Sequence, residues 1–516
     1  MLIQVGIIVS LAVTIFIGWV TGKKVKGKVE NYYVAGRRLS FLMVGLALVA
    51  QSIDGNATLG NSSLGFDFGF WAGAALPIGL ALSLFLLGLF FAPKLNSLKL
   101  LTLADFFGRK YNRTVEVLAS LLMLLSFGVL LAGNLAAVAI LLNLFFNINY
   151  QTSVVLICLA AVIYSIRGGI LSDILSDIFQ VALLVVGSLL TFGYLIYKYD
   201  FGQLFNSEIF SSGVSLTQLT QNADGALINW ATIFALGFGN LLAIDFIARV
   251  LAAKSAGTAR KACFLGGVLT LILGIPFSIL PLLLQWLNFV PAGETPVLMA
   301  FALETMPTIV VLLLTCGIIG VSLSTIDGAM LSMGNVLAHN LLNIKKDLRW
   351  GENNSVESEK SHLYFSRLAL IPVAGSAVIF AILLPSPGAL ISVAFDIMFA
   401  GLLVPFVFAF IFKKVYAKAA FYAIVIGSLA RFLFATLTPT SFGIDNSFFY
   451  VENSVISPAL DGLGTFLAPL VALYVYLLVH CIMVIKDSQP TPVVLTDNKP
   501  YSKPESVSSQ YHSNEQ

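Results

Sequence analysis

Long apolar stretches follow one another along almost the whole chain and are separated by short polar segments. A helix needs about twenty apolar residues to cross the core of a bilayer. Thirteen stretches suit this role, and we number them spans 0 to 12. They lie near residues 2–21, 40–65, 70–93, 115–146, 150–166, 171–197, 228–250, 262–288, 307–343, 365–384, 388–411, 419–438 and 461–485. The pattern predicts an all-α polytopic membrane protein with about thirteen transmembrane helices.

The composition agrees with this prediction, because 58% of the residues are hydrophobic, 11% are charged and the mean hydropathy is +0.92. Average soluble domains are far more polar. We expect a transmembrane domain over residues 1–487 and a disordered cytoplasmic tail over residues 488–516, which are rich in Ser, Pro, Asn and Gln. The partners expected are the lipid bilayer and small solutes. The net charge of +3 follows from the loops, so no nucleic acid is expected.

The distribution of basic residues predicts the topology, because Lys and Arg accumulate in short cytoplasmic loops. With the N-terminus outside, all but two of the 29 basic residues fall in predicted cytoplasmic segments. The exceptions are Lys198, in an outer loop, and Arg431, within a span. An odd number of spans fits this pattern. Span 0 lacks a basic segment before it and a cleavage site, so we expect a retained anchor in a multi-pass protein of the plasma membrane.

Span 1 is interrupted by a polar run from Ala50 to Thr58, in which Asp54 lies beside Gly55. A charge at the centre of an isolated membrane helix costs about 2.5 kcal/mol or more. Such a residue usually faces a protein interior, a cavity or an ion. We therefore expect Asp54 to have a functional role.

A second interruption is expected in span 6, where the segment 236–240 contains two glycines and is followed by Asp245 and Arg249. Transporters often carry paired broken helices at corresponding positions of two inverted repeats. Spans 1–5 and 6–10 would form these repeats, over residues of about 40–197 and 228–411. The alternative is that Gly237 and Gly239 only allow close helix packing.

Span 8 contains a second polar cluster, with Ser324 and Thr325 adjacent and Asp327 one turn further. A small hard cation needs several oxygen ligands, which helix hydroxyls and the carbonyls of a broken helix can supply. The alternative is that both hydroxyls bond back to carbonyls of their own helix.

Two acids lie on one face of span 5, because Asp173 and Asp177 are four residues apart. Asp173 is near the cytoplasmic end, where Arg167 or a helix N-terminus can pair with it. Asp177 lies deeper and is favoured as functional. In spans 10 and 11, Asp396 and Arg431 form either an ion pair or a gate.

Four segments resemble those of a known family. They are residues 33–37 before span 1, residues 164–170 leading to 176–180, residues 249–255 after span 6, and Ser324 with Thr325. With the spacing of the spans, they make the chain similar to the sodium:solute symporters, whose members carry sugars, proline, pantothenate, sialic acid or urea. The resemblance covers the chain up to about residue 485.

The resemblance implies a leucine-transporter-type fold of two inverted five-helix repeats, alternating access, and uptake driven by Na⁺ as coupling ion. The family's sodium ligands fall on the carbonyls of Ala50, Ile53 and Val321 and the hydroxyls of Ser324 and Thr325. Some members have a further sodium site at the position of Asp177. There, Val321 replaces a serine of those members, and Ser322 is the nearest substitute.

The expected substrate pocket departs from that of the sugar carriers. They have a Glu-Gln pair where Asn56 and Ala57 stand, and an aromatic gate near the position of Asp245. Sugar is therefore not expected, and residues 57–63 are instead similar to urea-transporting members. The residues expected to bind substrate are Ser52, Asp54, Asn56, Asn240 and Asp245.

These patterns predict a secondary active transporter that couples inward sodium flow to uptake of a small polar solute. A nitrogen-bearing solute is favoured, because ionised acids in the pocket need a cationic partner. The closest alternative is a proton-coupled carrier of the same fold. A transporter-like solute sensor would need a signalling domain, for which the tail leaves little room. An enzyme is not expected, since the four His residues show no metal-ligand spacing and no nucleophile and base stand out. The oligomeric state is left open.

Overall fold

A computed structural model describes residues 1–22, 25, 27–291, 293, 295–344, 356–383, 387–446, 449–453 and 456–488. The predicted tail beyond residue 488 lies outside these residues. The first half of the chain contains α1 Leu2–Gly22, α2 Val29–Val34, η2 Ala35–Arg37, α3 Phe41–Ser52, η3 Asn56–Gly60, α4 Asn61–Phe68, α5 Phe70–Leu86, η4 Leu87–Phe91, α6 Ala92–Ser97, α7 Ala104–Lys110, α8 Arg113–Phe146, α9 Tyr150–Lys198, α10 Phe201–Phe205, α11 Glu208–Gly213, α12 Thr217–Thr220 and η5 Asn222–Asp224.

The second half contains α13 Ala226–Phe234, η6 Ala235–Gly239, η7 Asn240–Leu242, α14 Ile244–Ala252, α15 Ala256–Trp286, α16 Val297–Thr305, α17 Thr308–Asn335, η8 Val336–Leu341, α18 Val356–Leu368, α19 Leu370–Leu383, α20 Ala389–Ile411, α21 Ala417–Leu437, η10 Pro458–Leu460 and α22 Leu463–Ser488. The two-residue strands β1 Thr440–Ser441 and β2 Ile444–Asp445 pair antiparallel. The all-α prediction is confirmed for the described part of the chain, where this short ribbon is the only sheet.

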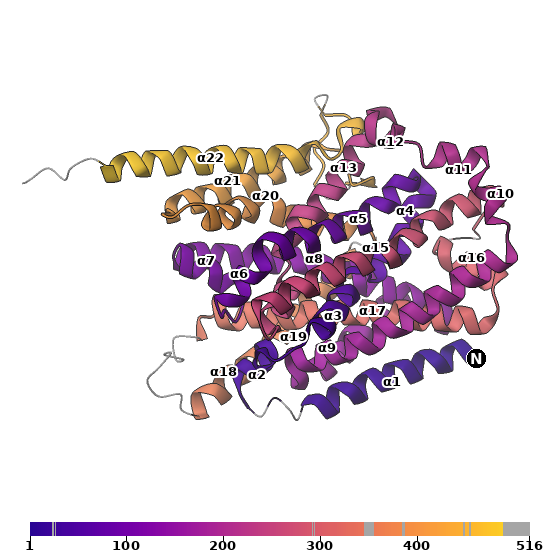
Figure 1. Cartoon of the computed structure of the whole chain (residues 1–516), viewed down its shortest axis with the longest axis horizontal. Coiled ribbons are helices and arrows are strands. Elements are labelled where there is room, and N and C mark those ends of the chain that lie inside the picture. Colours follow the sequence, from indigo (N-terminus) through magenta and orange to yellow (C-terminus); the bar gives the residue numbers. More distant parts are fainter. Residues whose placement is uncertain are drawn as a thin grey trace, which may run out of the picture.

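The long helices run roughly side by side as one bundle, with α1 along one edge and α22 along the opposite edge (Figure 1). The edge helices expose large apolar side chains, such as Phe16 on α1 and Leu470 on α22, at 61% and 57% of their surface. Lipid chains suit such surfaces, whereas water does not. The centre is formed by α17, which packs along α9 and is buried over most of its length.

Among the described residues, ten single helices and two bent pairs are long and apolar enough to cross a membrane, and they lie at twelve of the thirteen predicted positions. At the thirteenth, the apolar helix Tyr150–Ile163 is shorter than this. The predicted span over residues 150–166 is the first part of α9, which continues through a non-helical Gly169 into span 5. The chain is therefore a multi-pass integral membrane protein. The side of the N-terminus stays a prediction.

The two bent pairs are the spans in which the sequence predicts interruptions. In span 1, the helix Phe41–Ser52 meets the helix Asn56–Phe68 at an angle of 55°. In span 6, the helix Ala226–Leu242 meets the helix Ile244–Ala252 at 46°. The bend of span 6 lies at Ala243, a few residues beyond the predicted glycine segment. The glycine segment itself lies mostly in η6, which is a π-helical turn and not a break.

Candidate functional site

The bend of span 1 leaves backbone oxygens in the protein interior. Helix α3 ends at Ser52, and the next residue, Ile53, has non-helical φ and ψ of −106° and 67°. The last carbonyls of an ended helix, here including that of Ala50, lack donors from a following turn. Both Ala50 and Ile53 are wholly buried. Any group that satisfies these carbonyls must therefore come from inside the protein.

Asp54 caps the second half of the bent span, Asn56–Phe68. Its Oδ1 accepts the backbone N–H of Ala57 at 2.9 Å, as an N-cap residue does, and the Thr58 hydroxyl donates to its carbonyl at 2.8 Å. Its Oδ2 accepts from the Asn134 amide at 2.5 Å and from the Asn56 amide at 3.4 Å. A negative charge at a helix N-terminus also interacts favourably with the helix dipole. These hydrogen bonds and the helix dipole thus stabilise the buried carboxylate.

The second half of span 1 also contacts the start of span 10. The side-chain oxygen of Asn56 accepts the backbone N–H of Gly388 at 3.1 Å. A Cβ added at Gly60 would lie 2.4 Å from the Cα of Gly388, so the two backbones are in direct contact. Asn56 and Gly60 therefore join the bend to the turn that precedes α20.

Span 8 lies directly opposite the bend. The Gln51 amide nitrogen donates to the carbonyl and the hydroxyl of Ser324 at 2.9 Å and 2.7 Å. On the other side of the bend, a Cβ added at Gly55 would lie 2.4 Å from the hydroxyl of Ser322. Residues 50–55 of span 1 thus face residues 321–325 of span 8, which are the segments expected to hold sodium.

The predicted sodium ligands are backbone carbonyl and side-chain hydroxyl oxygens, which a small hard cation can bind. Thr325 donates its hydroxyl proton to the carbonyl of Val321 at 3.3 Å, which is the back-bonding alternative for this residue, and its oxygen keeps lone pairs. Ser324 does not bond back in this way. Among the described residues, no group of three or more His, Cys, Asp or Glu side chains could hold a metal. A cation here would rely on carbonyls and hydroxyls, as small hard cations can.

Ser324 belongs to a wholly buried ion-pair network. Its hydroxyl donates to Oδ1 of Asp177 at 2.5 Å. Arg249 then bridges two acids, with Nη2 at 2.8 Å from Oδ2 of Asp177 and at 2.7 Å from Oδ2 of Asp173. The network thus connects spans 1, 5, 6 and 8 through Gln51, Ser324, the two acids and Arg249.

This network corrects two expectations. Arg249, which the topology argument places in a cytoplasmic loop, is 0% exposed. Asp173 pairs with Arg249 and not with a helix N-terminus; the side chain of Arg167 lies outside the described residues. A buried ion pair is costly unless both charges are well matched, and one guanidinium between two carboxylates meets this need.

Gly328 makes room for the network. A Cβ at this position would lie 2.8 Å from Nη2 of Arg249 and 2.8 Å from Oε1 of Gln51. One residue earlier on α17, Asp327 accepts a hydrogen bond from the Ser165 hydroxyl of span 4. The polar face of span 8 is therefore engaged on several sides.

The bend of span 6 has fewer polar contacts. The amide of Asn240 donates to the Ser83 hydroxyl at 2.8 Å, and its buried oxygen has no hydrogen-bond partner. Asp245 accepts the N–H of Phe246 at 2.7 Å, and its backbone carbonyl accepts from Nη1 of Arg249 at 3.2 Å. Of the expected substrate residues, Ser52 points elsewhere, since its hydroxyl donates to the Leu48 carbonyl of its own helix.

Close backbone packing is the main feature around span 6. A Cβ added at Gly239 would lie 2.0 Å from the carbonyl oxygen of Phe395 on α20, and one at Gly237 would lie 2.7 Å from Leu82. These contacts match the packing alternative for the two glycines. The next residue on α20, Asp396, forms an ion pair with Arg431 of span 11, so the ion-pair reading of these two residues is confirmed.

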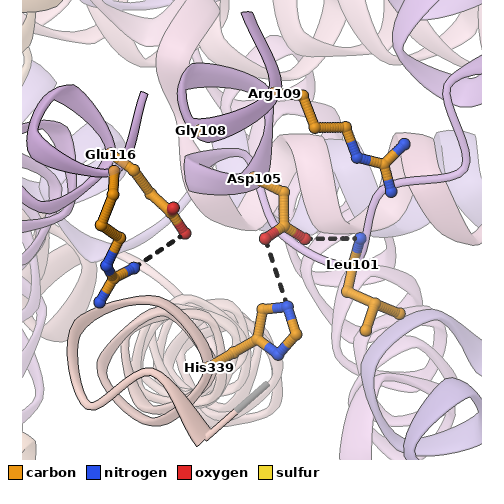
Figure 2. A pocket seen from close by; sticks show the side chains of 7 residues that line it. Leu101, Asp105, Gly108, Arg109, Glu116 and His339 are labelled. Carbon is orange, nitrogen blue, oxygen red and sulfur yellow. Dashed lines mark hydrogen bonds and ion pairs between the residues drawn. The ribbon is translucent and has the colours of Figure 1, made fainter. Parts of the chain in front are cut away.

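A separate polar cavity of about 380 Å³ lies where η8, α7 and the start of α8 meet (Figure 2). Asp105 accepts from His339 at 3.2 Å, and Glu116 pairs with Arg113 at 3.2 Å. The amide of Asn340 donates to both carboxylates. These groups bind one another across the cavity.

Sequence reasoning missed two residues of the site and one pairing. Gln51 and Asn134 are polar residues within apolar spans, and this signal alone could have selected them. The pairing of Arg249 with span 5 has no local signal. It joins residues more than seventy positions apart, so only the fold brings it about.

A model of the sodium:solute symporter family matches residues 32–427, about three quarters of the chain. The chain belongs to the sodium:solute symporter family. The four segments on which the resemblance rests are therefore supported by an independent match. The family is one of transporters.

Two relatives identified by sequence comparison are named for different solutes. The chain is 26% identical over 302 residues to a sodium/glucose cotransporter of Vibrio parahaemolyticus, and the match spans 52% of each chain, about half the length of that relative. It is 23% identical over 425 residues to the high-affinity choline transporter 1 of Drosophila melanogaster, which covers 80% of this chain and 67% of that protein.

The fold of the chain matches a solved structure, that of an outward-open Na⁺-coupled sialic acid symporter. The TM-score is 0.73 over 93% of this chain and 98% of the other, at 17% identity. At this identity the likeness shows the fold alone. The expected leucine-transporter-type fold is thereby confirmed.

Proposed function

We propose that the chain couples inward sodium flow to the uptake of a small polar, nitrogen-bearing solute across the plasma membrane. The observation that carries the proposal is the meeting of two segments. The freed carbonyls of Ala50 and Ile53 lie at the end of a buried helix, and Gln51 between them is hydrogen-bonded to Ser324 of span 8.

The coupling ion is proposed to bind between spans 1 and 8. Its ligands would be the carbonyls of Ala50, Ile53 and Val321 and the hydroxyls of Ser324 and Thr325. Bound there, Na⁺ would hold the inner half of span 1 against span 8. Asp177 would act through Ser324, since Arg249 already occupies its second oxygen. The direct sodium contact expected at Asp177 thus becomes a positioning role.

The solute is proposed to bind between the two bends. Asn240 offers a buried amide oxygen without a partner, and Asp245 offers a carboxylate at the start of the inner half of span 6. Asp54 and Asn56 line the opposite bend, and Ser52 contributes through its backbone. Two acids in one buried region favour a solute that carries positive charge. The similarity to a choline transporter supports a nitrogen-bearing solute.

The driving force suffices for concentrative uptake. One positive charge that moves down about 100 mV gains about 2.3 kcal/mol, and a tenfold sodium gradient adds about 1.4 kcal/mol. Together they allow an accumulation of several hundredfold for each sodium ion. The pairing of the two bends supports the predicted repeats over residues of about 40–197 and 228–411, which would move relative to each other during alternating access.

The test is uptake into proteoliposomes that contain the purified full chain. Radiolabelled quaternary ammonium compounds, amino acids, urea, polyamines and organic acids are offered with an inward sodium gradient, with potassium in place of sodium, and with an inward proton gradient alone. We expect sodium-dependent accumulation of a nitrogen-bearing solute and none with potassium. Uptake driven by protons without sodium would contradict the proposal in favour of the proton-coupled alternative, and binding without flux would favour a sensor.

A further inference from the structure

The Ser324 hydroxyl is almost fully engaged within the protein. A serine hydroxyl has one proton and two lone pairs. The proton is donated to Asp177 at 2.5 Å, and one lone pair accepts from the amide of Gln51 at 2.7 Å. One lone pair remains. The engaged lone pair faces α3, which is the helix that carries the carbonyl of Ala50.

The orientation of the Gln51 amide is fixed by its surroundings. Its nitrogen also donates to the backbone carbonyl of Ser324 at 2.9 Å, and a carbonyl can only accept. The amide nitrogen must therefore face α17, and the amide oxygen must point away from it. This oxygen is buried without a hydrogen-bond partner.

The free amide oxygen of Gln51 lies near the guanidinium of Arg249. A Cβ built on Gly328 would be 2.8 Å from this oxygen, 2.8 Å from Nη2 and 3.0 Å from Nη1 of Arg249. The amide oxygen and the guanidinium thus lie on either side of the space that Gly328 leaves open, with no hydrogen bond between them. The glutamine side chain has enough rotatable bonds for its amide to turn away from Ser324.

We propose that Gln51 is the side chain that sodium displaces from Ser324, so that Gln51 sets the sodium affinity. This inference rests on the proposed sodium site. A cation bound to Ser324 and to the carbonyl of Ala50 approaches from the side of α3, where the amide protons of Gln51 lie. Their partial positive charge opposes the cation, so the two cannot share the hydroxyl.

The displacement explains how one junction serves two states of the carrier. Without the ion, the two hydrogen bonds from Gln51 join the inner half of span 1 to span 8. With the ion, the coordination of sodium joins the same helices. Each sodium ion that binds must break the amide contacts, and this lowers its apparent affinity.

The test is equilibrium binding of radioactive sodium to the purified full chain, without solute. Gln51→Met keeps the length of the side chain but removes the amide. We expect its sodium half-saturation to fall about tenfold, the scale of one to two released hydrogen bonds. Loss of a merely structural contact would weaken binding, so a gain in affinity is specific to displacement. If Gln51→Met does not fold, Gln51→Asn, which is one methylene too short to keep both bonds, should change the half-saturation in the same direction.

A matched control is available in Gln4→Met. Gln4 also joins two helices through one amide, which donates to the Phe145 carbonyl at 2.8 Å, but it lies far from both bends in sequence. Its sodium half-saturation should equal that of the wild type. Unchanged or weaker binding in the Gln51 variants, beside normal wild-type binding, would overturn the inference alone. Absence of sodium binding by the wild type would overturn the proposed function itself.

Discussion

Around the bend of span 1, hydrogen bonds from neighbouring helices accompany the close contacts at Gly55 and Gly60. Around the bend of span 6, side-chain hydrogen bonds are fewer, and the close contacts at Gly237 and Gly239 are the main feature. Asp54 accepts from Asn134, and Gln51 donates to Ser324. In span 6, Gly239 lies against the carbonyl of Phe395 instead. Both spans bend by similar angles, 55° and 46°, so different interactions support the same geometry.

The two kinds of contact suit different roles. Hydrogen-bonding groups with free lone pairs can exchange one partner for an ion or solute at small cost, because each such bond contributes only about 1 kcal/mol. Tight backbone packing cannot exchange partners, but it fixes the position of a helix accurately. The bend of span 1 is therefore suited to exchange partners when an ion binds, and the glycines of span 6 are suited to hold that span against α20.

The largest effect is expected from Gly239→Ala, which disturbs the packed bend. Gly239 has ordinary helical φ and ψ of −67° and −40°, so an alanine meets no backbone strain there. The obstacle is the Phe395 carbonyl, 2.0 Å from the added Cβ. We expect a loss of stability of about 3 kcal/mol and loss of solute uptake, measured by thermal unfolding and proteoliposome flux.

The control for this variant is Gly375→Ala in α19, where an added Cβ meets nothing within 4 Å. A glycine inside a helix is less stable than alanine by about 0.5 to 1 kcal/mol. Gly375→Ala should therefore leave uptake unchanged and raise the unfolding temperature slightly. If Gly239→Ala behaved in the same way, close packing would not define the bend of span 6.

A smaller effect is expected at the hydrogen-bonded bend, from Asp54→Ala and Asp54→Asn. Alanine removes the helix cap and leaves the Asn134 amide without its acceptor, which together cost about 2 kcal/mol. Asparagine keeps an acceptor for the N–H of Ala57, and Asn134 can turn its unpartnered oxygen toward the new amide. Thermal unfolding should therefore separate the two variants by at least 1 kcal/mol.

The same two variants separate capping from charge. If the Asp54 carboxylate also attracts a cationic solute, Asp54→Asn should raise the solute concentration for half-maximal uptake while stability stays near that of the wild type. Equal solute affinity in Asp54→Asn and the wild type would limit this residue to its cap and exclude it from substrate binding.

Much of the fold could be predicted from the sequence, because apolar length and basic loops reflect the bilayer directly. The interruption at Asp54 and Gly55 could be located for the same reason, since a polar run within a span is costly unless it faces the protein interior. The bend at Ala243 could not be located as well from Gly237 and Gly239, because a glycine signals close packing as readily as it signals a break.

The interactions inside the site could not be predicted in the same way. Arg249 is near the end of its span, and local sequence alone makes it one more loop cation. Its place between Asp173 and Asp177 depends on how spans 5 and 6 approach each other. Charge pairs across helices carry no periodicity that a single sequence reveals, so only the structure shows that Asp177 is already paired.

The most direct test of the proposed sodium site is the sodium affinity of Thr325→Val, measured by binding of radioactive sodium and compared with Thr315→Val. Both threonines are wholly buried on α17, and both variants keep the side-chain shape. If the bend of span 1 holds the ion against Thr325, its variant should lose a ligand oxygen and bind sodium at least tenfold more weakly, while Thr315→Val binds as the wild type does. Equal sodium affinity in the two variants would contradict a sodium site between spans 1 and 8.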